Sequence, residues 1–491
     1  MQADELVHGA PDQNELLKQL VWPPSYQNPI PKKKYHLVVI GAGPAGLIAS
    51  ISAAGLGANV ALVEKAHMGG DCLNNGCVPS KALLAYTQRN KDAAFEDAFS
   101  WMRKIRASIA HHDSVQRYVD AGVDVFLGEG SFKSNGELMV GDAILSSRRF
   151  AIATGARSKL PPIPGLQEAN PLTPESFFEL TECPDSIAIL GGGAVGCELA
   201  QVMGRLGSKV HLFEAADTLL PAEEYFVSRT LQSSLEKEGV VVHTGDRVER
   251  IEDGRTIISQ SGSYECHKIL VALGRQPNTE GLGLSALGVK CDEVGHPLID
   301  SKLRTTNKKI YAIGDCTGHY QFTHFADGQA RALVQNALFA NTAKISSEKT
   351  PRSTYTQPEV AAVGASTRML DQQGEVYDTY EYFFDELDRV KVGKLSKGVH
   401  REEHGFVRVL VKRGGDQILG ATIIGPNAGD DIAPLVVMMT NNLGLGSLSS
   451  TIFSYPTRSE YLKKLSDAFR KTRLTPFVAG LFRRWLSLTA R

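Results

Sequence analysis

Cys72 and Cys77 have the clearest chemical potential in this chain, in the segment GGDCLNNGCVPSK at residues 69–81. With four residues between them and a glycine just upstream of each, the two thiols can close a strained disulfide that is easily reduced. In a reducing compartment, a cysteine pair is more often catalytic or metal-binding than structural. The pair therefore predicts thiol–disulfide redox chemistry, and the alternative is two unrelated buried thiols.

The chain contains two glycine-rich turns, each between a buried strand and a helix. In this pattern the first glycine makes a tight turn, the second lets the backbone approach a pyrophosphate, and the third lets helix and strand pack closely. The phosphates then lie at a helix N-terminus. The glycines are Gly41, Gly43 and Gly46 in the first turn and Gly191, Gly193 and Gly196 in the second. Two such turns predict two dinucleotide sites.

Each glycine-rich turn is followed by the same arrangement of residues. Glu64 and Glu214 end the next strand at equal distances from the first glycine of their copy, and an acidic residue at this place binds a ribose hydroxyl. Each copy later closes with a strand and a further glycine turn, FAIATGARS at 150–158 and ILVALGRQP at 269–277. The two nucleotide-binding halves therefore share one design.

At 491 residues the chain is too long for one hydrophobic core, and we expect about three domains. The predicted fold class is α/β, with two Rossmann-like dinucleotide-binding domains and a C-terminal α+β domain. The predicted parts are a polar N-terminal arm at 1–34, a first nucleotide-binding domain at 35–160 and 291–350, a second at 161–290, the α+β domain at 351–468 and a tail at 469–491. We expect the proline-rich arm to lie extended over the surface, and residues 101–120 to form one amphipathic helix.

The composition excludes several function classes. A net charge of −1 argues against a nucleic-acid partner. Seven scattered cysteines suit a reducing compartment, in which one pair is functional and the others pack as small apolar groups. No apolar run reaches the roughly 18 residues of a membrane span, and residues 1–34 lack a secretory signal pattern, so we expect a cytoplasmic protein. His111 and His112 lack partners at ligand spacing, and no metal site is predicted.

The C-terminal tail places large apolar residues among arginines and a lysine, and Pro476 is expected to break it into two parts. Such a basic amphipathic segment can lie on an anionic membrane surface. The alternative, which the sequence favours, is a helix packed against the same chain or a partner subunit.

The two glycine turns, the Cys72–Cys77 pair and the segment YAIGDC at 311–316 together resemble the pyridine nucleotide-disulfide oxidoreductase family. This family includes glutathione reductase, dihydrolipoamide dehydrogenase and mercuric reductase. The resemblance covers residues 35–468, in both the sequence and the order of the motifs. It implies an enzyme that uses FAD and NAD(P)H, and a homodimer formed through the C-terminal domain, which would be a dimerisation domain.

On this resemblance, the first nucleotide-binding domain would bind FAD. Lys81 would lie near flavin N5 with Glu198 as its ion-pair partner; the cation would stabilise electron density on the ring, and the carboxylate would offset the cost of burying it. The residues implied to hold the pyrophosphate and the ribose are Gly41, Gly43, Gly46 and Glu64. Those implied to line the rest of FAD are Gly130, Thr154, Gly155, Gly314, Asp315, Thr323 and His324.

The second glycine turn would bind the nicotinamide cofactor, together with Gly274. Glu214 is followed by Ala215 and Ala216, with no arginine close behind it to receive a 2′-phosphate. A carboxylate there hydrogen-bonds a ribose 2′-hydroxyl and repels a phosphate. NADH is therefore favoured over NADPH.

The resemblance also implies a path for electrons, from the nicotinamide through the flavin to the cysteine pair. Cys77 would face the flavin as the charge-transfer thiolate, and Cys72 would exchange with the substrate. The segment Tyr455–Glu460, with Tyr455 and Glu460 at its ends, would complete the active site of the partner subunit.

The substrate end departs from glutathione reductase and dihydrolipoamide dehydrogenase, which use a histidine as acid and base where this chain has Tyr455. A phenol with a pKa near about 10 is a poor proton shuttle at neutral pH. Mercuric reductases also have a tyrosine there, and a soft metal ion needs thiolates instead of a proton donor. They end in vicinal cysteines, however, whereas this chain has no cysteine after Cys316.

The electron acceptor is therefore left open at this stage. The sequence is closest to a mercuric-reductase-like enzyme that reduces Hg(II) or another soft metal ion. The alternatives are reduction of a disulfide or oxidation of dihydrolipoamide, and reduction of quinone or oxygen straight from the flavin. A different class, a redox or nucleotide sensor with negligible turnover, has no effector surface in the sequence.

Overall fold

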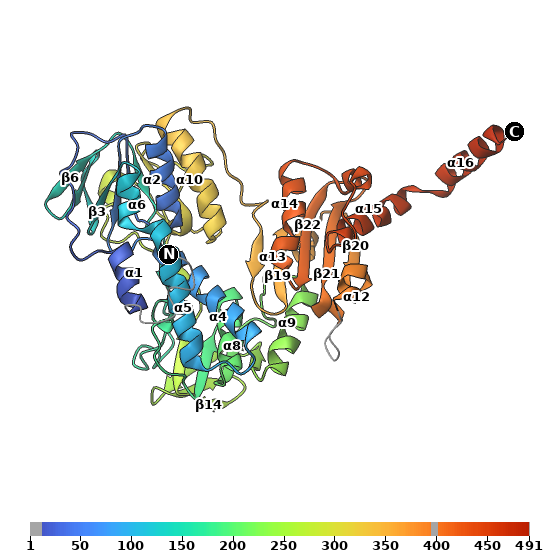
Figure 1. Ribbon diagram of the computed structural model, residues 1–491, viewed down its shortest axis with the longest axis horizontal. Helices are drawn as coiled ribbons and strands as arrows, with labels where there is room; N and C mark the ends of the chain where they lie inside the picture. The colour runs from blue at the N-terminus through green and yellow to red at the C-terminus, as the bar shows by residue number, and fades with distance from the viewer. Residues whose placement is uncertain (1–11, 394–400, 491) are drawn as a thin grey trace. The chain divides into compact units, whose positions relative to one another are not determined.

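The computed structural model describes residues 12–393 and 401–490 (Figure 1). The chain divides into two compact units, each with its own core. The first unit comprises Met1–Gly191, Leu199–Phe213 and Asp246–Ser347, and the second comprises Gly192–Glu198, Glu214–Gly245 and Glu348–Arg491.

The first unit is built on a five-stranded parallel sheet. Its strands follow the order β17 (Ile310–Ala312), β7 (Phe150–Ile152), β1 (Leu37–Ile40), β2 (Val60–Glu64) and β3 (Val123–Leu127). These strands are rich in Val, Ile and Leu because a parallel sheet is covered on both faces. Helices α2 (Pro44–Gly55) and α10 (Thr323–Leu338) pack together and share one core cluster with the sheet. The carboxyl end of β1 thus opens into the first glycine turn.

A second parallel arrangement in the first unit leads at Gly191 into the other glycine turn, whose residues from Gly192 on are grouped with the second unit. Strand β9 (Ser186–Leu190) lies between β10 (Lys209–Glu214) and β15 (Lys268–Val271), and α8 (Ala194–Arg205) follows β9 in the chain. Three smaller antiparallel groups complete the unit. They are β4–β5–β6 (Gly130–Ser134, Glu137–Val140, Ala143–Ser146), β12–β13–β14 (Val248–Glu252, Thr256–Ser259, Ser263–Glu265) and the pair β8–β16 (Ala156–Ser158, Arg275–Pro277).

The second unit holds a five-stranded antiparallel sheet. The strand order is β18 (Arg352–Thr354), β19 (Glu359–Gly364), β22 (Ile418–Gly425), β21 (Phe406–Lys412) and β20 (Tyr377–Phe383). Helices α14 (Ala433–Thr440) and α15 (Glu460–Arg473) contribute Leu435, Tyr461 and Leu465 to its core. The predicted α/β class with a C-terminal α+β region is confirmed, whereas the domain boundaries drawn from the sequence stay predictions.

Two consecutive glutamates tie residues 214–245 to the antiparallel sheet within the second unit. Glu223 forms a two-point ion pair with Arg352, at 2.9 and 3.1 Å. Glu224 is buried and accepts hydrogen bonds from the backbone nitrogen and the hydroxyl of Thr367, at 2.7 and 2.8 Å, and from Arg408 at 3.1 Å. We call this arrangement the glutamate clamp.

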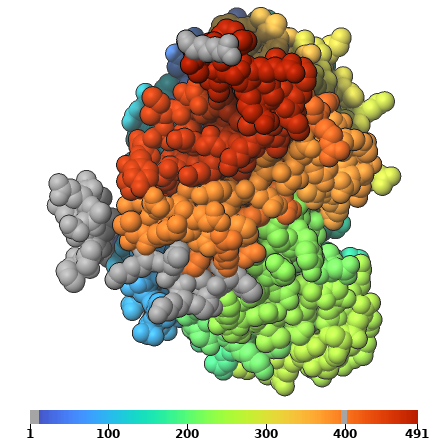
Figure 2. Space-filling model, turned by 90° about the vertical axis from the view of Figure 1, so that its right-hand side faces the viewer, coloured from blue at the N-terminus to red at the C-terminus, as the bar shows by residue number. Residues whose placement is uncertain are grey.

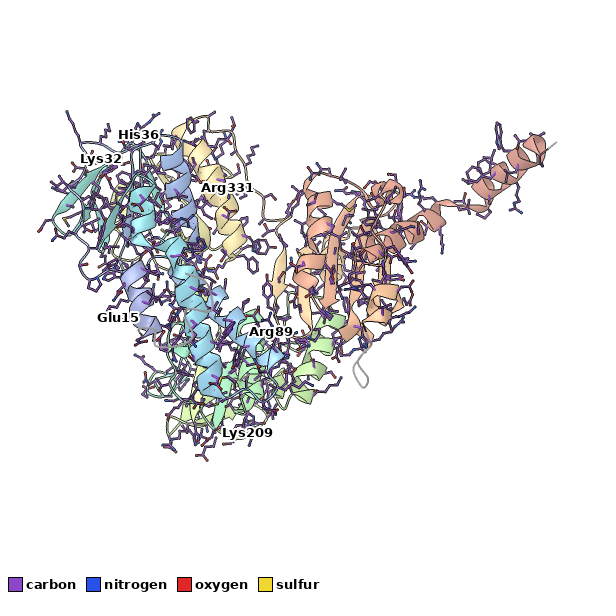
Figure 3. The ribbon with its side chains drawn as sticks, viewed as in Figure 1. Glu15, Lys32, His36, Arg89, Lys209 and Arg331 are labelled. Carbon is purple, nitrogen blue, oxygen red and sulfur yellow. The ribbon has the colours of Figure 1, made fainter. Side chains whose placement is uncertain are left out.

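The N-terminal arm is not extended throughout, contrary to the sequence expectation. Residues Gln13–Val21 form helix α1, which begins at the N-cap Asp12 and buries Leu17 and Val21 in the core of the first unit. The helical spacing of these apolar residues explains the difference, because it offers a face to bury. Further along the arm, Lys32, which is labelled in Figure 3, pairs with Asp124 on β3 at 2.9 Å. The first 11 residues lie outside the described part.

The segment 101–120 is not a single helix either. Helix α5 (Phe95–Ala110) ends before a 3-10 turn (His111–Asp113), and α6 (Val115–Asp120) begins after Ser114. Ser114 is extended and its hydroxyl accepts a hydrogen bond from the Arg117 nitrogen. A serine N-cap of this kind starts a new helix even where apolar spacing continues across it.

The C-terminal tail is broken at Pro476, as predicted. Helix α15 ends at Arg473, and a separate helix α16 (Pro476–Thr489) follows it (Figure 1). No helix within residues 12–393 and 401–490 is long and apolar enough to cross a membrane.

Candidate active site

The first and third glycines of the first turn are required by the fold itself. Gly41 has a φ of +104°, and a Cβ atom there would lie 2.3 Å from the carbonyl oxygen of Ala153. A Cβ atom on Gly46 would lie 1.8 Å from the carbonyl oxygen of Gly41, because α2 packs directly on the turn. Any side chain at either position would displace backbone.

The second glycine turn repeats this geometry. Gly191 has a φ of +115°, and its Cβ atom would lie 2.5 Å from the carbonyl oxygen of Ala272. Ala153 and Ala272 follow the closing strands β7 and β15, so each closing strand comes close to the first glycine of its own copy. The internal repeat read from the sequence is therefore a repeat of backbone geometry.

The middle glycines have no such role in packing. The nearest atom to a Cβ on Gly43 would be 3.8 Å away, and a Cβ on Gly193 would meet nothing within 4 Å. Gly43 has a φ of −76°, which any residue adopts. The missing side chain instead leaves open space at the N-termini of α2 and α8, where the helix dipole favours a phosphate. Both turns therefore fit the pyrophosphate of a dinucleotide.

The strand-end glutamates hold these turns in the same way. Glu64 accepts hydrogen bonds from the nitrogens of Ala42 at 2.6 Å and Ala66 at 2.7 Å. Glu214 accepts them from Gly192 at 2.7 Å and Ala216 at 2.8 Å. Burial raises the pKa of Glu64, and the backbone donors act against that rise. Each carboxylate thus fixes the backbone just after the first glycine of its turn.

Cys72 and Cys77 lie on two consecutive helices. Cys72 is part of α3 (Gly70–Asn74), and Cys77 is the first residue of α4 (Cys77–Arg89). Both are free thiols, and the hydrogen bond between Cys72 and Cys77, followed by burial, raises the pKa of Cys72. A raised pKa favours the protonated form of Cys72.

Two helix N-termini lie at Cys77. Its sulfur lies 3.5 Å from the hydroxyl of Thr323, which is the first residue of α10. The N-termini of α4 and α10 therefore meet at one thiol, and both helix dipoles stabilise a thiolate there. Cys77 is also exposed, so it is open to a bound group.

An acidic and basic cluster that sequence reasoning missed lies beside the cysteines. Asp71 of α3 forms an ion pair with Arg275 of β16. Burial raises the pKa of Asp315 to about 6, Arg275 opposes this rise, and Asp71 and Cys77 add to it. The sequence signal that could have pointed to these two residues is their position, since Asp71 precedes Cys72 and Arg275 follows Gly274. Neither position indicates by itself that the two side chains meet.

Other predicted residues are placed on elements around the same region of the first unit. Lys81 follows Cys77 by one turn of α4, on the same face. His324 follows Thr323 and stacks on Phe322, with ring centroids 5.3 Å apart. The predicted glycines Gly155, Gly274 and Gly314 all have positive φ, whereas Gly130 is packed against Leu138 in the protein core. Thr154 precedes Gly155 in the turn after β7.

Glu198 and the Tyr455–Glu460 segment belong to the second unit. Glu198 is buried and accepts a hydrogen bond from the Tyr355 nitrogen at 2.9 Å. The pairing of Glu198 with Lys81 stays a prediction. Tyr455 is 69% exposed and donates its hydroxyl to Asp388 at 2.7 Å, a hydrogen bond that raises the pKa of the phenol. Glu460 is the first residue of α15.

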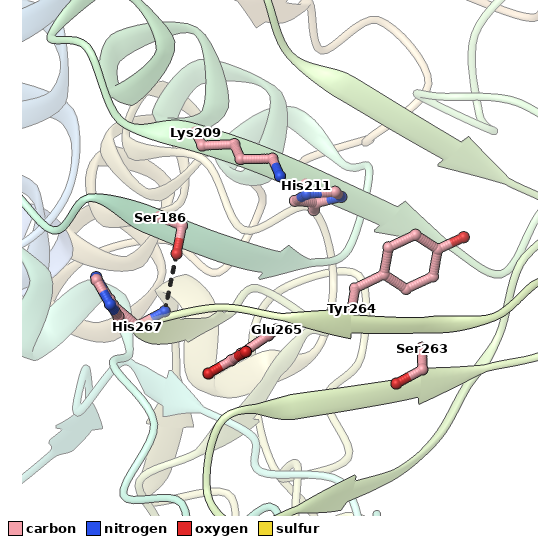
Figure 4. A pocket seen from close by; sticks show the side chains of 7 residues that line it. All are labelled: Ser186, Lys209, His211, Ser263, Tyr264, Glu265 and His267. Carbon is pink, nitrogen blue, oxygen red and sulfur yellow. Dashed lines mark hydrogen bonds between the residues drawn. The ribbon is translucent and has the colours of Figure 1, made fainter.

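A polar hollow of about 480 Å³ lies elsewhere in the first unit (Figure 4). None of the predicted redox or nucleotide-binding residues lines it; its lining comprises Ser186, Lys209, His211, Ser263, Tyr264, Glu265 and His267. Across the described ranges, no group of three or more His, Cys, Asp or Glu residues is arranged to hold a metal ion.

The sequence was compared with known families, and two regions match. Residues 35–330 match the family described as pyridine nucleotide-disulphide oxidoreductase. Residues 350–466 match the pyridine nucleotide-disulphide oxidoreductase dimerisation domain.

Similar proteins of known description span most of the chain. The dihydrolipoyl dehydrogenase of Chlamydia muridarum is 34% identical over 448 residues, which are 87% of this chain and 95% of that protein. The mercuric reductase of Staphylococcus aureus is 31% identical over 459 residues, which are 89% of this chain and 83% of that protein. Among solved structures, the Cu(II) complex of the HOCl-induced flavoprotein disulfide reductase RclA from Escherichia coli superposes with a TM-score of 0.80. That structure is 27% identical, and the match covers 89% of this chain and 100% of RclA.

Proposed function

This chain belongs to the pyridine nucleotide-disulphide oxidoreductase family, and from that premise we propose that it reduces a thiophilic metal ion held by Cys72 and Cys77. The enzyme is FAD-dependent and takes its electrons from NAD(P)H. The proposal concerns the electron acceptor and the residues that serve it.

The residues proposed to hold the cofactors are those that leave space for phosphates. The turn at Gly41–Gly46, with Glu64, would hold FAD, and the turn at Gly191–Gly196, with Glu214, would hold the nicotinamide cofactor. Bound FAD supplies the two-electron chemistry that links NAD(P)H to protein thiols. We also propose NADH as the preferred donor, because no arginine follows Glu214 to receive a 2′-phosphate.

The cysteine pair provides the groups that a soft metal ion needs. A thiophilic ion binds thiolates, and the two helix N-termini at Cys77 lower the cost of a negative sulfur. NAD(P)H is oxidised to NAD(P)+, its two electrons reduce one Hg(II) ion to Hg(0) or two Cu(II) ions to Cu(I), and one proton is released to solvent. No proton has to be delivered to the product of either reaction.

The proposal of a metal ion as the acceptor depends mainly on Tyr455. Its hydroxyl is hydrogen-bonded to Asp388, which raises the pKa of the phenol above its ordinary value near 10. Reduction of a disulfide substrate needs an acid to protonate the leaving thiolate, and this phenol is a poor donor at neutral pH. The mercuric reductase relatives and the Cu(II) complex of RclA support a metal acceptor.

A second candidate is disulfide reduction or dihydrolipoamide oxidation. It is favoured by the similarity to dihydrolipoyl dehydrogenases, at 34% identity for the protein of Chlamydia muridarum.

The match to a dimerisation domain indicates homodimer formation in this family. We further propose that Tyr455 and Glu460 complete the site of the partner subunit, and that the enzyme works in the cytoplasm, which the scattered free cysteines support.

The test is a comparison of acceptors with the holoenzyme. Oxidation of NADH and NADPH would be followed with Hg(II), Cu(II), lipoamide and a soluble quinone, for the wild type and for Cys72→Ala. Cys183→Ala, which removes a thiol outside the pair, is the matched control. We expect metal-dependent turnover that Cys72→Ala abolishes and the control retains. Lipoamide turnover well above metal turnover, or metal turnover that survives Cys72→Ala, would reject the proposal.

A further inference from the structure

Helix α16 exposes a cluster of large apolar side chains that the proposed redox chemistry does not use. None of its residues, Pro476–Thr489, is buried. The side chains of Phe477, Trp485 and Leu488 are 76%, 67% and 73% exposed. The preceding helix α15 behaves differently, because it buries Leu465 and Phe469 in the core of the second unit.

Four of the large apolar residues of α16 share one side of the helix, whereas two others, Phe482 and Leu486, lie away from that side. At 3.6 residues per turn, Phe477, Leu481, Trp485 and Leu488 lie along one side of the helix. Arg483 and Ser487 lie on the opposite side, and Arg484 lies at the border between the two. The sequence favours a helix packed against the same chain or a partner subunit. Within the described residues α16 buries none of its side chains, so its apolar side is left for a partner subunit or a membrane.

The charge around α16 identifies the chemistry of that occupant. The last acidic residue of the chain is Asp467, and no Asp or Glu follows it. The basic residues beyond that point are Arg470, Lys471, Arg473, Arg483, Arg484 and Arg491. Arg470, Lys471 and Arg473 lie exposed in the last turn of α15, so the basic side chains continue from one helix into the next. Figure 2 shows this red C-terminal segment at the molecular surface.

We propose that α16 lies in the interface of an anionic lipid membrane and tethers the enzyme to it. The apolar side with Phe477 and Trp485 would enter the boundary between headgroups and acyl chains, and the arginines would contact anionic headgroups. A helix of 14 residues is shorter than the roughly 20 residues that cross a bilayer, but it suits binding in the plane of the surface. This inference does not depend on the identity of the electron acceptor.

Binding to vesicles gives the direct test. The holoenzyme would be sedimented with vesicles of phosphatidylcholine alone and with vesicles that also contain phosphatidylglycerol. We expect at least about tenfold more bound enzyme on the anionic vesicles, since each basic residue adds to the attraction, and a loss of binding at high salt. Equal binding to both vesicles, or binding to neither, would overturn the proposal.

Trp485 offers a signal from the helix itself. The chain has three tryptophans, Trp22, Trp101 and Trp485. Anionic vesicles should shift the fluorescence of the wild type to shorter wavelength, and Trp485→Phe should lose that shift while it still sediments with the vesicles. The double variant Arg483→Gln, Arg484→Gln should bind several-fold less, and the control Ser487→Ala should bind as the wild type does. An unchanged double variant would contradict the role of charge.

Removal of α16 distinguishes between a lipid surface and a partner subunit as the surface that its apolar side contacts. A chain that ends at Thr475 should lose vesicle binding, and it should keep both its oligomeric state in solution and its NAD(P)H oxidation with a soluble acceptor. Because α16 buries nothing in the described structure, this truncation should fold. If the shortened chain instead changes from a dimer to a monomer, α16 covers the partner subunit and the proposal is wrong.

Discussion

On the proposed function, Tyr455 limits which substrates the enzyme can protonate, and it is an exposed residue that can be replaced without disturbing a core. Tyr455→His would place an imidazole with a pKa near neutrality where the phenol now stands. We expect turnover of a disulfide such as lipoamide to rise by about tenfold or more, since general acid–base catalysis contributes roughly 10²–10⁴. Steady-state NADH oxidation measures the gain.

A matched control for this substitution exists in the same unit. Tyr377 is a second tyrosine whose hydroxyl donates to an aspartate, Asp371, at 2.9 Å. Tyr377→His should leave disulfide turnover at the wild-type level. If Tyr455→His gives no more turnover than Tyr377→His does, the acid–base argument for Tyr455 fails.

Asp315 should make the cofactor-free protein less stable as the pH rises. Burial raises its pKa to about 6, from an ordinary value of 3.8, so the folded protein binds this proton more tightly than the unfolded chain. The stabilisation is therefore complete below about pH 4 and is lost as the pH rises from about 4 to 6. At 1.36 kcal/mol for each pKa unit, the loss is about 3 kcal/mol.

Replacement of Asp315 by asparagine tests this pH dependence. Asp315→Asn cannot ionise, so above pH 6 the cofactor-free variant should be more stable than the wild type, and below pH 4 the difference should vanish. Urea unfolding at several pH values measures it, with the exposed residue Asp142 changed to Asn as the control. The charged or titratable groups that act on the Asp315 carboxyl are Arg275, Asp71 and Cys77. A difference that does not depend on pH would contradict the raised pKa.

At the scale of elements, each glycine turn separates glycines that the fold needs from one that a ligand needs. Gly41→Ala would press a Cβ atom to 2.3 Å from the Ala153 carbonyl oxygen at a φ of +104°, and it should prevent stable folding. Gly43→Ala meets nothing closer than 3.8 Å, so the variant should fold. It should lose most of its FAD, because the added methyl group fills the space for the pyrophosphate.

The second turn supplies the matched experiment. Gly193→Ala, for which no atom lies within 4 Å of the new Cβ, should keep its FAD and raise the KM for NADH by about tenfold or more. Thermal unfolding and the ratio of flavin to protein absorbance distinguish the variants. If Gly43→Ala retains FAD at the wild-type ratio, the assignment of the first turn is incorrect.

The elements were predictable where a local pattern determines them. The strands and helices around Gly41 and Gly191 follow from buried β-branched runs and glycine spacing, both of which are local. Helix α1 and the break at Ser114 were missed because proline content and apolar periodicity outweighed the capping signals of Asp12 and Ser114. The Asp71–Arg275 ion pair could not be predicted, since it joins side chains far apart in the sequence.

At the scale of the whole molecule, the glutamate clamp should contribute strongly to the stability of the second unit. Glu224 is 4% exposed and has three hydrogen bonds from Thr367 and Arg408. Glu224→Ala leaves those donors without their acceptor, and we expect a loss of about 3 kcal/mol, as for other broken buried ion pairs. Denaturant unfolding measures the change.

The control uses the other partner of the same arginine. Glu381 contacts Arg408 from the exposed side, at 2.7 Å. Glu381→Ala should cost less than about 1 kcal/mol, because exposed ion pairs contribute little. Equal losses for the two variants would show that burial of Glu224 is not the source of the stabilisation.

The two strand-end glutamates have a consequence for how nucleotides arrive. Because Glu64 and Glu214 accept hydrogen bonds from the nitrogens of Ala42 and Gly192, the protein itself supplies contacts that order the backbone of each turn. A nucleotide that enters such a turn does not lose free energy to the conformational entropy of a disordered loop. Preorganisation of this kind lets an emptied protein take up its cofactor again without refolding.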